Sequence, residues 1–227
     1  MSRFPLVVFD LDGTLVDSRR DLAESVNDLI VERGGALLSE ASVGRMVGDG
    51  AAVLVLRAFE AARLPADPDA LGRFLAIYGA RSLKHTRPYP GVIDLLARLE
   101  GKIELAVLTN KPLAATRDIL AGLDLARYFP SDRVRGGDGP LPRKPDPAGL
   151  LRLASDAGVA PESVLLVGDS LIDWRTARAA GTAICLARWG FGFEGFPVAE
   201  LAADNWVIGA PDELLEIVSR RPRSGRP

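Results

Sequence analysis

The stretch LVVFDLDGTLVDS, residues 6–18, decides the fold and raises a question of chemistry. Residues 6–9 form a short apolar run rich in Val and Phe, which is typical of a strand buried on both faces. Asp10 and Asp12 follow directly, separated by one leucine. Because side chains two residues apart lie on the same side of an extended chain, we expect both carboxylates at one end of a central strand.

The chain after residue 86 alternates apolar strands with amphipathic helices. The expected strands are residues 103–109, 164–167, 182–187 and 206–208, and the expected helices are residues 92–100, 113–120, 147–157, 172–180 and 212–218. Alternation of this kind predicts a parallel sheet with helices on both faces. The expected fold class is therefore α/β, with a three-layer core around a Rossmann-like parallel sheet.

The segment 17–86 follows a different pattern, because it contains helical periodicity and no strand-like alternation. Ser18 and Asp21 resemble a capping box, and apolar residues then recur at helical spacing as far as Gly34. Two further helices are expected over residues 51–64 and 70–84. The sequence thus predicts a small helical subdomain inserted into the α/β core.

Polar residues follow three of the expected strands at their carboxyl ends. They are Asp10 with Asp12, then Thr109 with Asn110, then Asp169, with Asp173 one helical turn further on. Ligands of parallel α/β sheets bind at this edge, so we expect these residues to meet there. Several carboxylates in one place require a counter-cation, and oxygen ligands favour Mg²⁺. The sequence disfavours an EF-hand calcium loop starting at Asp10, because Leu15 and Asp21 stand where that loop needs Gly and Glu.

The composition narrows the classes of function. The 227 residues carry a net charge of −2, which does not suggest binding to nucleic acid or to an anionic membrane. No apolar run is long enough to span a membrane, and we expect a cytoplasmic protein. The lone His85 cannot supply a multi-histidine zinc site, and the lone Cys185 is expected in strand packing. Residues 219–227 are expected to be a solvated basic end.

Four motifs carry a resemblance to a known superfamily: DLDGT at 10–14, LTNKP at 108–112, RKPDP at 143–147 and GDSLID at 168–173. Each motif alone also has an ordinary structural interpretation as a strand-to-helix turn, a capped helix or an exposed loop. Together and in this order they resemble the haloacid dehalogenase superfamily of phosphohydrolases over essentially the whole chain. The resemblance implies an α/β core formed by residues 1–16 and 87–227, with an α-helical cap domain at 17–86.

The resemblance implies roles for the first motif. Asp10 is expected to be the nucleophile, forming an aspartyl-phosphate while contacting Mg²⁺. Asp12 is expected to be the general acid and then the general base, and to give its carbonyl to the metal. Gly13 and Thr14 shape the turn. Since the dehalogenases of the superfamily lack an aspartate at the position of Asp12, the chain resembles a phosphoryl-transfer member.

The resemblance also implies roles for the other motifs. The hydroxyl of Thr109 and the backbone amide of Asn110 are expected to bind the transferring phosphoryl group. Lys144 is expected to balance the charge on the nucleophile and the phosphate. Asp169 is expected to bind the metal directly, and Asp173 to hold the metal or its water. The implied cofactor is Mg²⁺, and the implied partner is a small phosphate ester.

Within the superfamily, the chain most resembles the phosphoglycolate phosphatases. The stretches that carry this are VGDGAAVLVLRAF, TRPYPGV, GLDLARYF, GGDG and WGFG. In the expected cap, Gly48 and Gly50 are candidates for close approach to the substrate, and Arg45 for pairing with its carboxylate. A loop turn and a solvated arginine explain these three residues equally well.

Other interpretations stay open. A sugar-phosphate phosphatase, a pyrophosphatase or a phosphomutase would have the same core motifs, and a non-catalytic protein could keep the fold. The Pro- and Gly-rich stretch RGGDGPLPRKP and Trp174 depart from the usual family pattern and leave the substrate less defined than the reaction. The sequence is compatible with a monomer or a homodimer.

Overall fold

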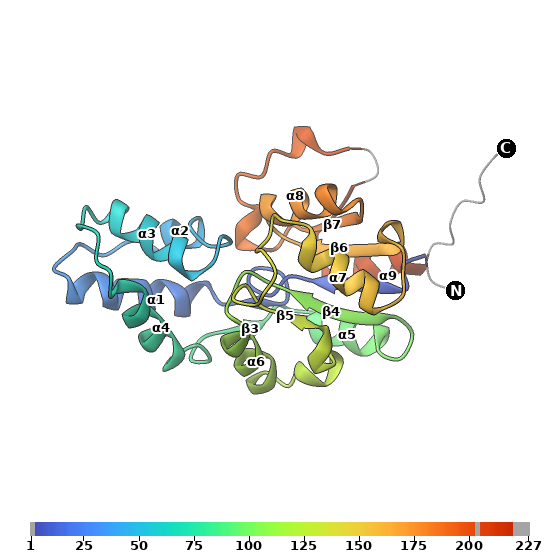
Figure 1. The fold of residues 1–227 in the computed structure, drawn as a ribbon, viewed down its shortest axis with the longest axis horizontal. Helices are drawn as coiled ribbons and strands as arrows, with labels where there is room; N and C mark the ends of the chain where they lie inside the picture. Colours follow the sequence, from blue (N-terminus) through green and yellow to red (C-terminus); the bar gives the residue numbers. More distant parts are fainter. Residues whose placement is uncertain (1–2, 203–204, 220–227) are drawn as a thin grey trace.

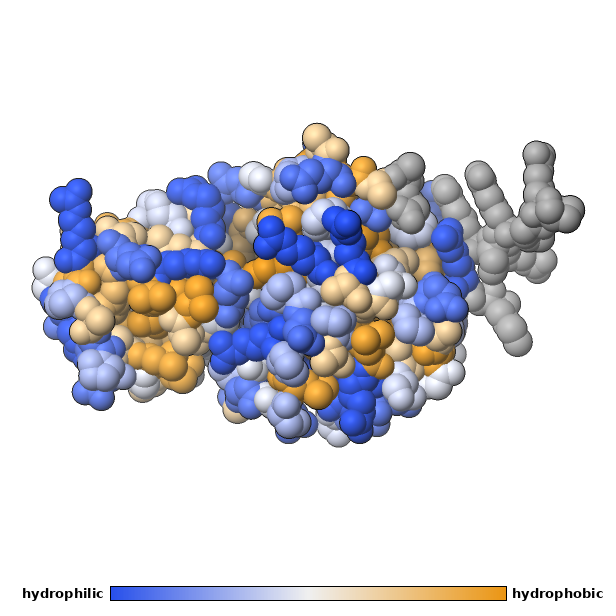
Figure 2. All heavy atoms as spheres, turned by 45° about the horizontal axis from the view of Figure 1, so that its top comes forward, coloured by the Kyte–Doolittle hydropathy of each residue, from blue (hydrophilic) through white to orange (hydrophobic). Residues whose placement is uncertain are grey.

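The computed structural model describes residues 3–202 and 205–219, which form two lobes joined at a waist (Figure 1). The larger lobe contains the main sheet, and the smaller lobe contains helices α1 to α4. Figure 2 shows the waist from another side and apolar side chains gathered on the surface of the smaller lobe. The basic end at 220–227 lies outside the described residues.

A parallel sheet of six strands forms the centre of the larger lobe, as the sequence predicts. Its order is β5-β4-β1-β6-β7-β8. The strands are β1 (Leu6–Phe9), β4 (Glu104–Leu108), β5 (Val134–Arg135), β6 (Val164–Gly168), β7 (Ala183–Ala187) and β8 (Trp206–Ile208). Phe9 at the end of β1 is level with Val107 on one side and Val167 on the other. The carboxyl ends of β1, β4 and β6 are therefore neighbours.

Side chains alternate across the sheet and bury its two faces separately. Val7 and Phe9 of β1 pack with α5 (Val92–Leu99), α6 (Leu113–Gly122) and α9 (Leu214–Ser219). Leu6 and Val8 pack with α7 (Ala148–Asp156) and α8 (Leu171–Ala180). This two-sided burial explains why β1 is a continuous apolar run, and it confirms the predicted three-layer α/β fold.

The smaller lobe is helical and is inserted between two short strands. Its helices are α1 (Arg19–Glu32), α2 (Glu40–Gly44), α3 (Ala51–Ala61) and α4 (Ala70–Gly79). The strands β2 (Val16–Asp17) and β3 (Arg87–Pro88) pair antiparallel where the chain leaves the core and returns to it. On this arrangement we propose that the helical lobe is a cap domain with boundaries near residues 17 and 86.

The predicted capping box at the start of α1 is wrong. Ser18 occupies the N-cap position, but its side chain caps no backbone amide and instead donates a 2.5 Å hydrogen bond to Asp12. The Asp21 carboxylate is fully buried and accepts hydrogen bonds from the backbone and hydroxyl of Thr86 and from the backbone of His85. Asp21 thus ties the start of α1, where the chain leaves the core, to residues 85 and 86, where it returns to the core.

None of the helices in the described part of the chain has the length and apolar character needed to cross a membrane.

Candidate functional site

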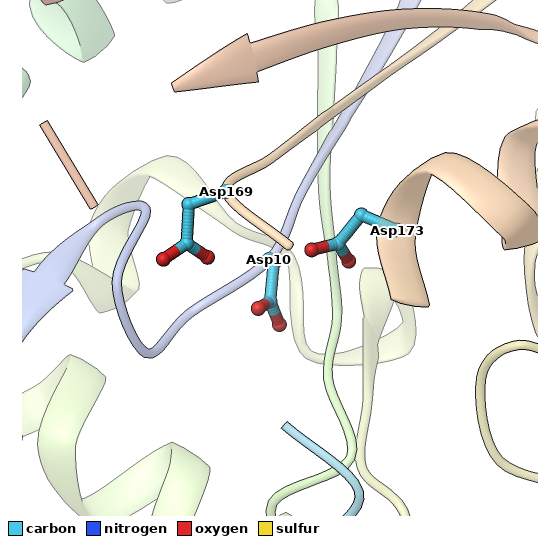
Figure 3. Close-up of side chains that lie close together, drawn as sticks. All are labelled: Asp10, Asp169 and Asp173. Atoms are coloured by element: carbon cyan, nitrogen blue, oxygen red, sulfur yellow. The ribbon is translucent and has the colours of Figure 1, made fainter. Parts of the chain in front are cut away.

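The site lies at the carboxyl edge of the sheet, where three neighbouring strands end. Asp10 follows β1, Thr109 follows β4 and Asp169 follows β6. Asp173 comes from the first turn of α8. Figure 3 shows the carboxylates of Asp10, Asp169 and Asp173 converging on one another. Strand adjacency therefore brings together residues that lie up to 159 positions apart, as the strand-end argument predicts.

The three carboxylates form a buried acidic cluster. Each offers one oxygen within 4.8 Å of the others. Burial raises the pKa of Asp10 to about 6, opposed by the charge of Lys144 and supported by that of Asp173. Burial together with the charges of Asp173 and Asp10 also raises the pKa of Asp169 well above its ordinary value. Ionising all three carboxylates therefore requires positive charge close to them.

Lys144 supplies one positive charge to this cluster. Its ammonium lies 2.8 Å from an Asp10 oxygen and 2.6 Å from an Asp173 oxygen. Burial by itself lowers the pKa of Lys144, but the charges of Asp10 and Asp173 outweigh it and hold the pKa above the usual range. Asp173 also accepts hydrogen bonds from the backbone and hydroxyl of Ser170, in a capping box that opens α8. Three carboxylates against one ammonium leave a net negative site.

The turn after β1 fits closely around Asp169. Gly13 has a φ of +87°, and a Cβ built on it would lie 2.0 Å from an Asp169 oxygen. A side chain at this position would therefore displace the carboxylate as well as strain the backbone. The Thr14 hydroxyl donates to the same carboxylate at 3.3 Å, and the Gly192 amide donates at 2.7 Å. These contacts fix the orientation of Asp169.

Asp12 lies beside the cluster and has its own cationic partner. The Lys111 ammonium donates to both Asp12 oxygens, at 2.8 and 3.1 Å, and the Ser18 hydroxyl donates to one of them. Lys111 also lies over the ring of Tyr78 in α4, 4.5 Å from its centre. Burial raises the pKa of Tyr78 to about 12, so its hydroxyl stays protonated near neutral pH.

Thr109 and Asn110 hold the turn after β4. The Thr109 hydroxyl accepts a 3.3 Å hydrogen bond from the Lys111 amide. The Asn110 side-chain amide donates to the carbonyls of Gly48 and Lys144, both at 2.8 Å. Asn110 therefore connects the smaller lobe to the loop that carries Lys144.

A pocket between the two lobes opens onto these residues. Its cavity volume is about 60 Å³, which is room for a small ligand. Its core side is formed by Asp10, Asp12, Thr109, Asn110, Lys111, Pro112 and Ala115, and its other side by Leu22, Val47, Gly48, Gly50, Ala51, Leu54, Phe74, Leu75 and Tyr78. The polar groups are therefore concentrated on the core side, opposite a mostly apolar wall.

The three candidate residues of the smaller lobe differ in their positions. Gly48 and Gly50 line the pocket and have positive φ values of +127° and +90°. Arg45 is absent from the lining: its half-exposed side chain lies 3.7 Å from Glu194. The structure therefore gives no support to pairing of Arg45 with a substrate carboxylate.

Two polar residues of the pocket, Lys111 and Tyr78, were not predicted as site residues. Lys111 directly follows Asn110 in LTNKP, so its position after a central strand is a signal that could have identified it. Tyr78 belongs to an amphipathic helix, where an aromatic residue ordinarily means packing. Only the folded arrangement of the two lobes brings Tyr78 to Lys111.

The donor set of the acidic cluster fits a hard divalent cation. Its three side-chain ligands are all carboxylates, which suit Mg²⁺ better than the softer transition metals. When all three carboxylates are ionised, Lys144 neutralises only one of the charges, so a net negative charge remains for a divalent cation. Asp10, Asp169 and Asp173 could therefore hold a metal ion.

Comparisons with known proteins agree with this geometry. The sequence model of the haloacid dehalogenase-like hydrolase family matches residues 4–181. A phosphoglycolate phosphatase of Rhodospirillum rubrum is 45% identical over 206 residues, covering 87% of this chain and 84% of the relative. A phosphoglycolate phosphatase of Cereibacter sphaeroides is 40% identical over 223 residues, covering 95% of this chain and 98% of the relative.

A solved structure supports the same assignment. The crystal structure of a predicted phosphoglycolate phosphatase from Haemophilus somnus superposes with a TM-score of 0.86 at 32% identity, covering 96% of this chain and 99% of that one. These matches confirm the predicted superfamily, its α/β fold and the enzyme class, a phosphoric monoester hydrolase. The chain belongs to the haloacid dehalogenase-like hydrolases.

Proposed function

We propose that this enzyme is a Mg²⁺-dependent phosphatase that hydrolyses 2-phosphoglycolate through an aspartyl-phosphate on Asp10. The observation that carries the proposal is the position of Asp10: it lines the pocket, lies 2.8 Å from the Lys144 ammonium and belongs to the acidic cluster. A buried carboxylate placed between a cation and a metal-binding cluster suits nucleophilic attack on a phosphate dianion.

In the first step, an Asp10 oxygen attacks phosphorus and the bond from phosphorus to the ester oxygen breaks. Asp12, which also lines the pocket, gives a proton to the departing alkoxide. The Thr109 hydroxyl and the backbone amide of Asn110 donate hydrogen bonds to the phosphoryl oxygens, and Lys144 offsets the charge of these oxygens. The products of this step are glycolate and the aspartyl-phosphate.

In the second step, Asp12 acts as the base. It takes a proton from a water molecule, whose oxygen attacks the phosphorus of the aspartyl-phosphate. The bond between phosphorus and the Asp10 oxygen breaks, so inorganic phosphate leaves and the Asp10 carboxylate is restored. Two displacements thus replace one difficult hydrolysis.

The proposed metal ligands are the carboxylates of Asp10, Asp169 and Asp173 and the backbone carbonyl of Asp12. When bound, Mg²⁺ supplies positive charge that stabilises the phosphoryl oxygens in the transition state. The close contacts of Gly13, Thr14 and Gly192 with Asp169 keep that carboxylate in place for this task.

The substrate is proposed from the relatives. Proteins named phosphoglycolate phosphatase match this chain at 40 to 45% identity over most of their length. The pocket is bounded by the smaller lobe, which suits a small metabolite enclosed away from water. A cytoplasmic location, where phosphorylated metabolites are found, is part of the proposal, and so is action as a monomer or a homodimer.

Phosphate release from a panel of esters tests this function. The purified enzyme is given 2-phosphoglycolate, sugar phosphates, nucleotides and pyrophosphate, each with Mg²⁺ or with EDTA. We expect the highest kcat/KM for 2-phosphoglycolate and loss of activity in EDTA. A higher kcat/KM for a sugar phosphate or pyrophosphate would overturn the substrate, and activity that persists in EDTA would overturn the metal dependence.

A further inference from the structure

The catalytic motifs bind the phosphate of the substrate, but they do not account for binding of its organic part at the other end of the pocket. Seven of its lining residues in the smaller lobe are apolar or aromatic: Leu22, Val47, Ala51, Leu54, Phe74, Leu75 and Tyr78. A carboxylate placed against an apolar wall without a partner is strongly disfavoured. A substrate that carries a carboxylate therefore needs a cation or a hydrogen-bond donor at this end.

Lys111 is the one cationic side chain among the described residues that line the pocket. Its side chain is only 5% exposed, and its ammonium lies between the carboxylate of Asp12 and the ring of Tyr78. An ammonium has three N–H donors, and the two Asp12 oxygens account for two of them. The third donor is on the side of Tyr78, so Lys111 can keep Asp12 in place and donate to an anion bound beside Tyr78.

Tyr78 provides a second, independent observation. The residue is 3% exposed, and its hydroxyl has no hydrogen bond of normal geometry within the part of the chain that the structure describes, although the Lys111 ammonium lies close enough to interact with it. A buried polar group without a partner is costly, so such a group that lines a pocket points to a ligand. The hydroxyl is a neutral donor, which suits a carboxylate oxygen.

The position of Lys111 also limits the length of the substrate. Asp12 must reach the ester oxygen to protonate it, and the Lys111 ammonium lies 2.8 Å from Asp12. A carboxylate one carbon away from the ester oxygen thus falls next to Lys111. A longer chain would carry its carboxylate past this position.

We propose that Lys111 from the core and Tyr78 from α4 together bind the carboxylate of the substrate, and so select short phosphate monoesters with a carboxylate next to the ester carbon. This inference rests on the proposed function and assigns its specificity to two named residues. Because each lobe contributes one of them, the carboxylate also joins the lobes across the pocket.

The test compares 2-phosphoglycolate with ethyl phosphate, in which a methyl group replaces the carboxylate. The ratio of their kcat/KM values is measured for the wild type, Tyr78→Phe, Lys111→Met and Tyr128→Phe. Tyr128 is a matched control, because it is equally buried and its hydroxyl accepts from Arg127, away from the pocket. We expect the ratio to fall about tenfold in Tyr78→Phe, further in Lys111→Met, and to stay at the wild-type value in Tyr128→Phe.

A binding measurement keeps the inference testable if turnover fails. Calorimetry gives the Kd of both esters, with Mg²⁺, for Asp10→Asn alone and combined with each of the other substitutions. If the wild type does not hydrolyse 2-phosphoglycolate, while Asp10→Asn binds it more tightly than ethyl phosphate and Tyr78→Phe weakens that binding, the proposed function is overturned but the carboxylate site is supported. Equal binding of the two esters, or an unchanged preference in folded Tyr78→Phe, would overturn the carboxylate site even if hydrolysis is confirmed.

Discussion

At the scale of single residues, the site depends on an imbalance of buried charge. Asp10, Asp169 and Asp173 converge, and Lys144 offsets only part of their charge. Burial of Asp10 dominates over its attraction to Lys144, so its pKa rises from the ordinary 3.8 to about 6. A proton or a metal ion can relieve the imbalance, and the two compete for the same oxygens.

The raised pKa of Asp10 predicts how stability changes with pH in EDTA. The folded pKa lies above the unfolded one, so the stabilising contribution of the neutral carboxyl is fully present below about pH 4 and is lost as the pH rises through about 6. Asp10→Asn lacks this titration. From pH 4 to pH 7, the free energy of unfolding of the wild type should fall relative to Asp10→Asn by at most about 3 kcal/mol.

Urea denaturation of both proteins across this pH range measures that difference. A difference that stays constant, or that grows in favour of the wild type, would contradict the raised pKa. Asp94→Asn, an exposed position in α5, controls for the general effect of removing one carboxylate.

Much of the site could be predicted from the sequence, because strand ends impose proximity. Asp10, Thr109 and Asp169 follow apolar runs that form adjacent strands, so their meeting follows from the topology. No comparable rule predicts which side chains of the two lobes contact each other. The pairing of Lys111 with Tyr78, and the partnership of Arg45 with Glu194, depend on how the lobes pack.

At the scale of elements, long segments could be predicted and short ones could not. The helices α1 and α8 carry enough apolar positions to show their period, and β1 stands out as a continuous apolar run. The two-residue strands β2, β3 and β5 are too short to show a period, and the five-residue α2 is too short to be distinguished from a turn. Helix α4 ends at Gly79 and not at the expected Lys84, since residues 80–84 form turns and bends.

The contact of α1 with residues 85 and 86 predicts that Asp21→Asn lowers the free energy of unfolding strongly. One oxygen of the fully buried Asp21 accepts three hydrogen bonds, from the amides of His85 and Thr86 and from the Thr86 hydroxyl. An asparagine can keep its oxygen at this position only by turning its NH2 group toward the His85 amide, which also donates to the other Asp21 oxygen at 3.0 Å. We expect the free energy of unfolding to fall by about 2–4 kcal/mol.

Asp28→Asn is the matched control for this change. Asp28 lies on the same helix, but it is half-exposed and pairs with Arg81 at the surface. Its substitution should cost less than about 1 kcal/mol in the same denaturation experiment. Equal losses in the two variants would show that Asp21 does not hold the connection.

At the scale of the whole molecule, the sheet assembles the site from distant segments, and the helical lobe covers it. The proposed metal ligands come from the ends of β1 and β6 and from α8. A cation held by all three therefore bridges the centre of the larger lobe. Since unfolding separates these ligands, metal binding should stabilise the fold.

Thermal unfolding with and without Mg²⁺ measures this effect. Mg²⁺ should raise Tm more at pH 7.5 than at pH 5, because the raised pKa values of Asp10 and Asp169 let protons compete with the metal at the lower pH. Asp169→Asn should lose most of the increase, and Asp94→Asn should keep it. An increase that is equal at both pH values, or that survives in Asp169→Asn, would contradict a metal held by this cluster.

The central claim is that Asp10 performs the hydrolysis. Phosphate release from 2-phosphoglycolate, with Mg²⁺, by the wild type, Asp10→Asn and Asp94→Asn tests this claim most directly. We expect a rate in folded Asp10→Asn at least about a thousandfold below the wild type, and a wild-type rate in Asp94→Asn. A folded Asp10→Asn enzyme that keeps more than about a tenth of the wild-type rate would contradict it.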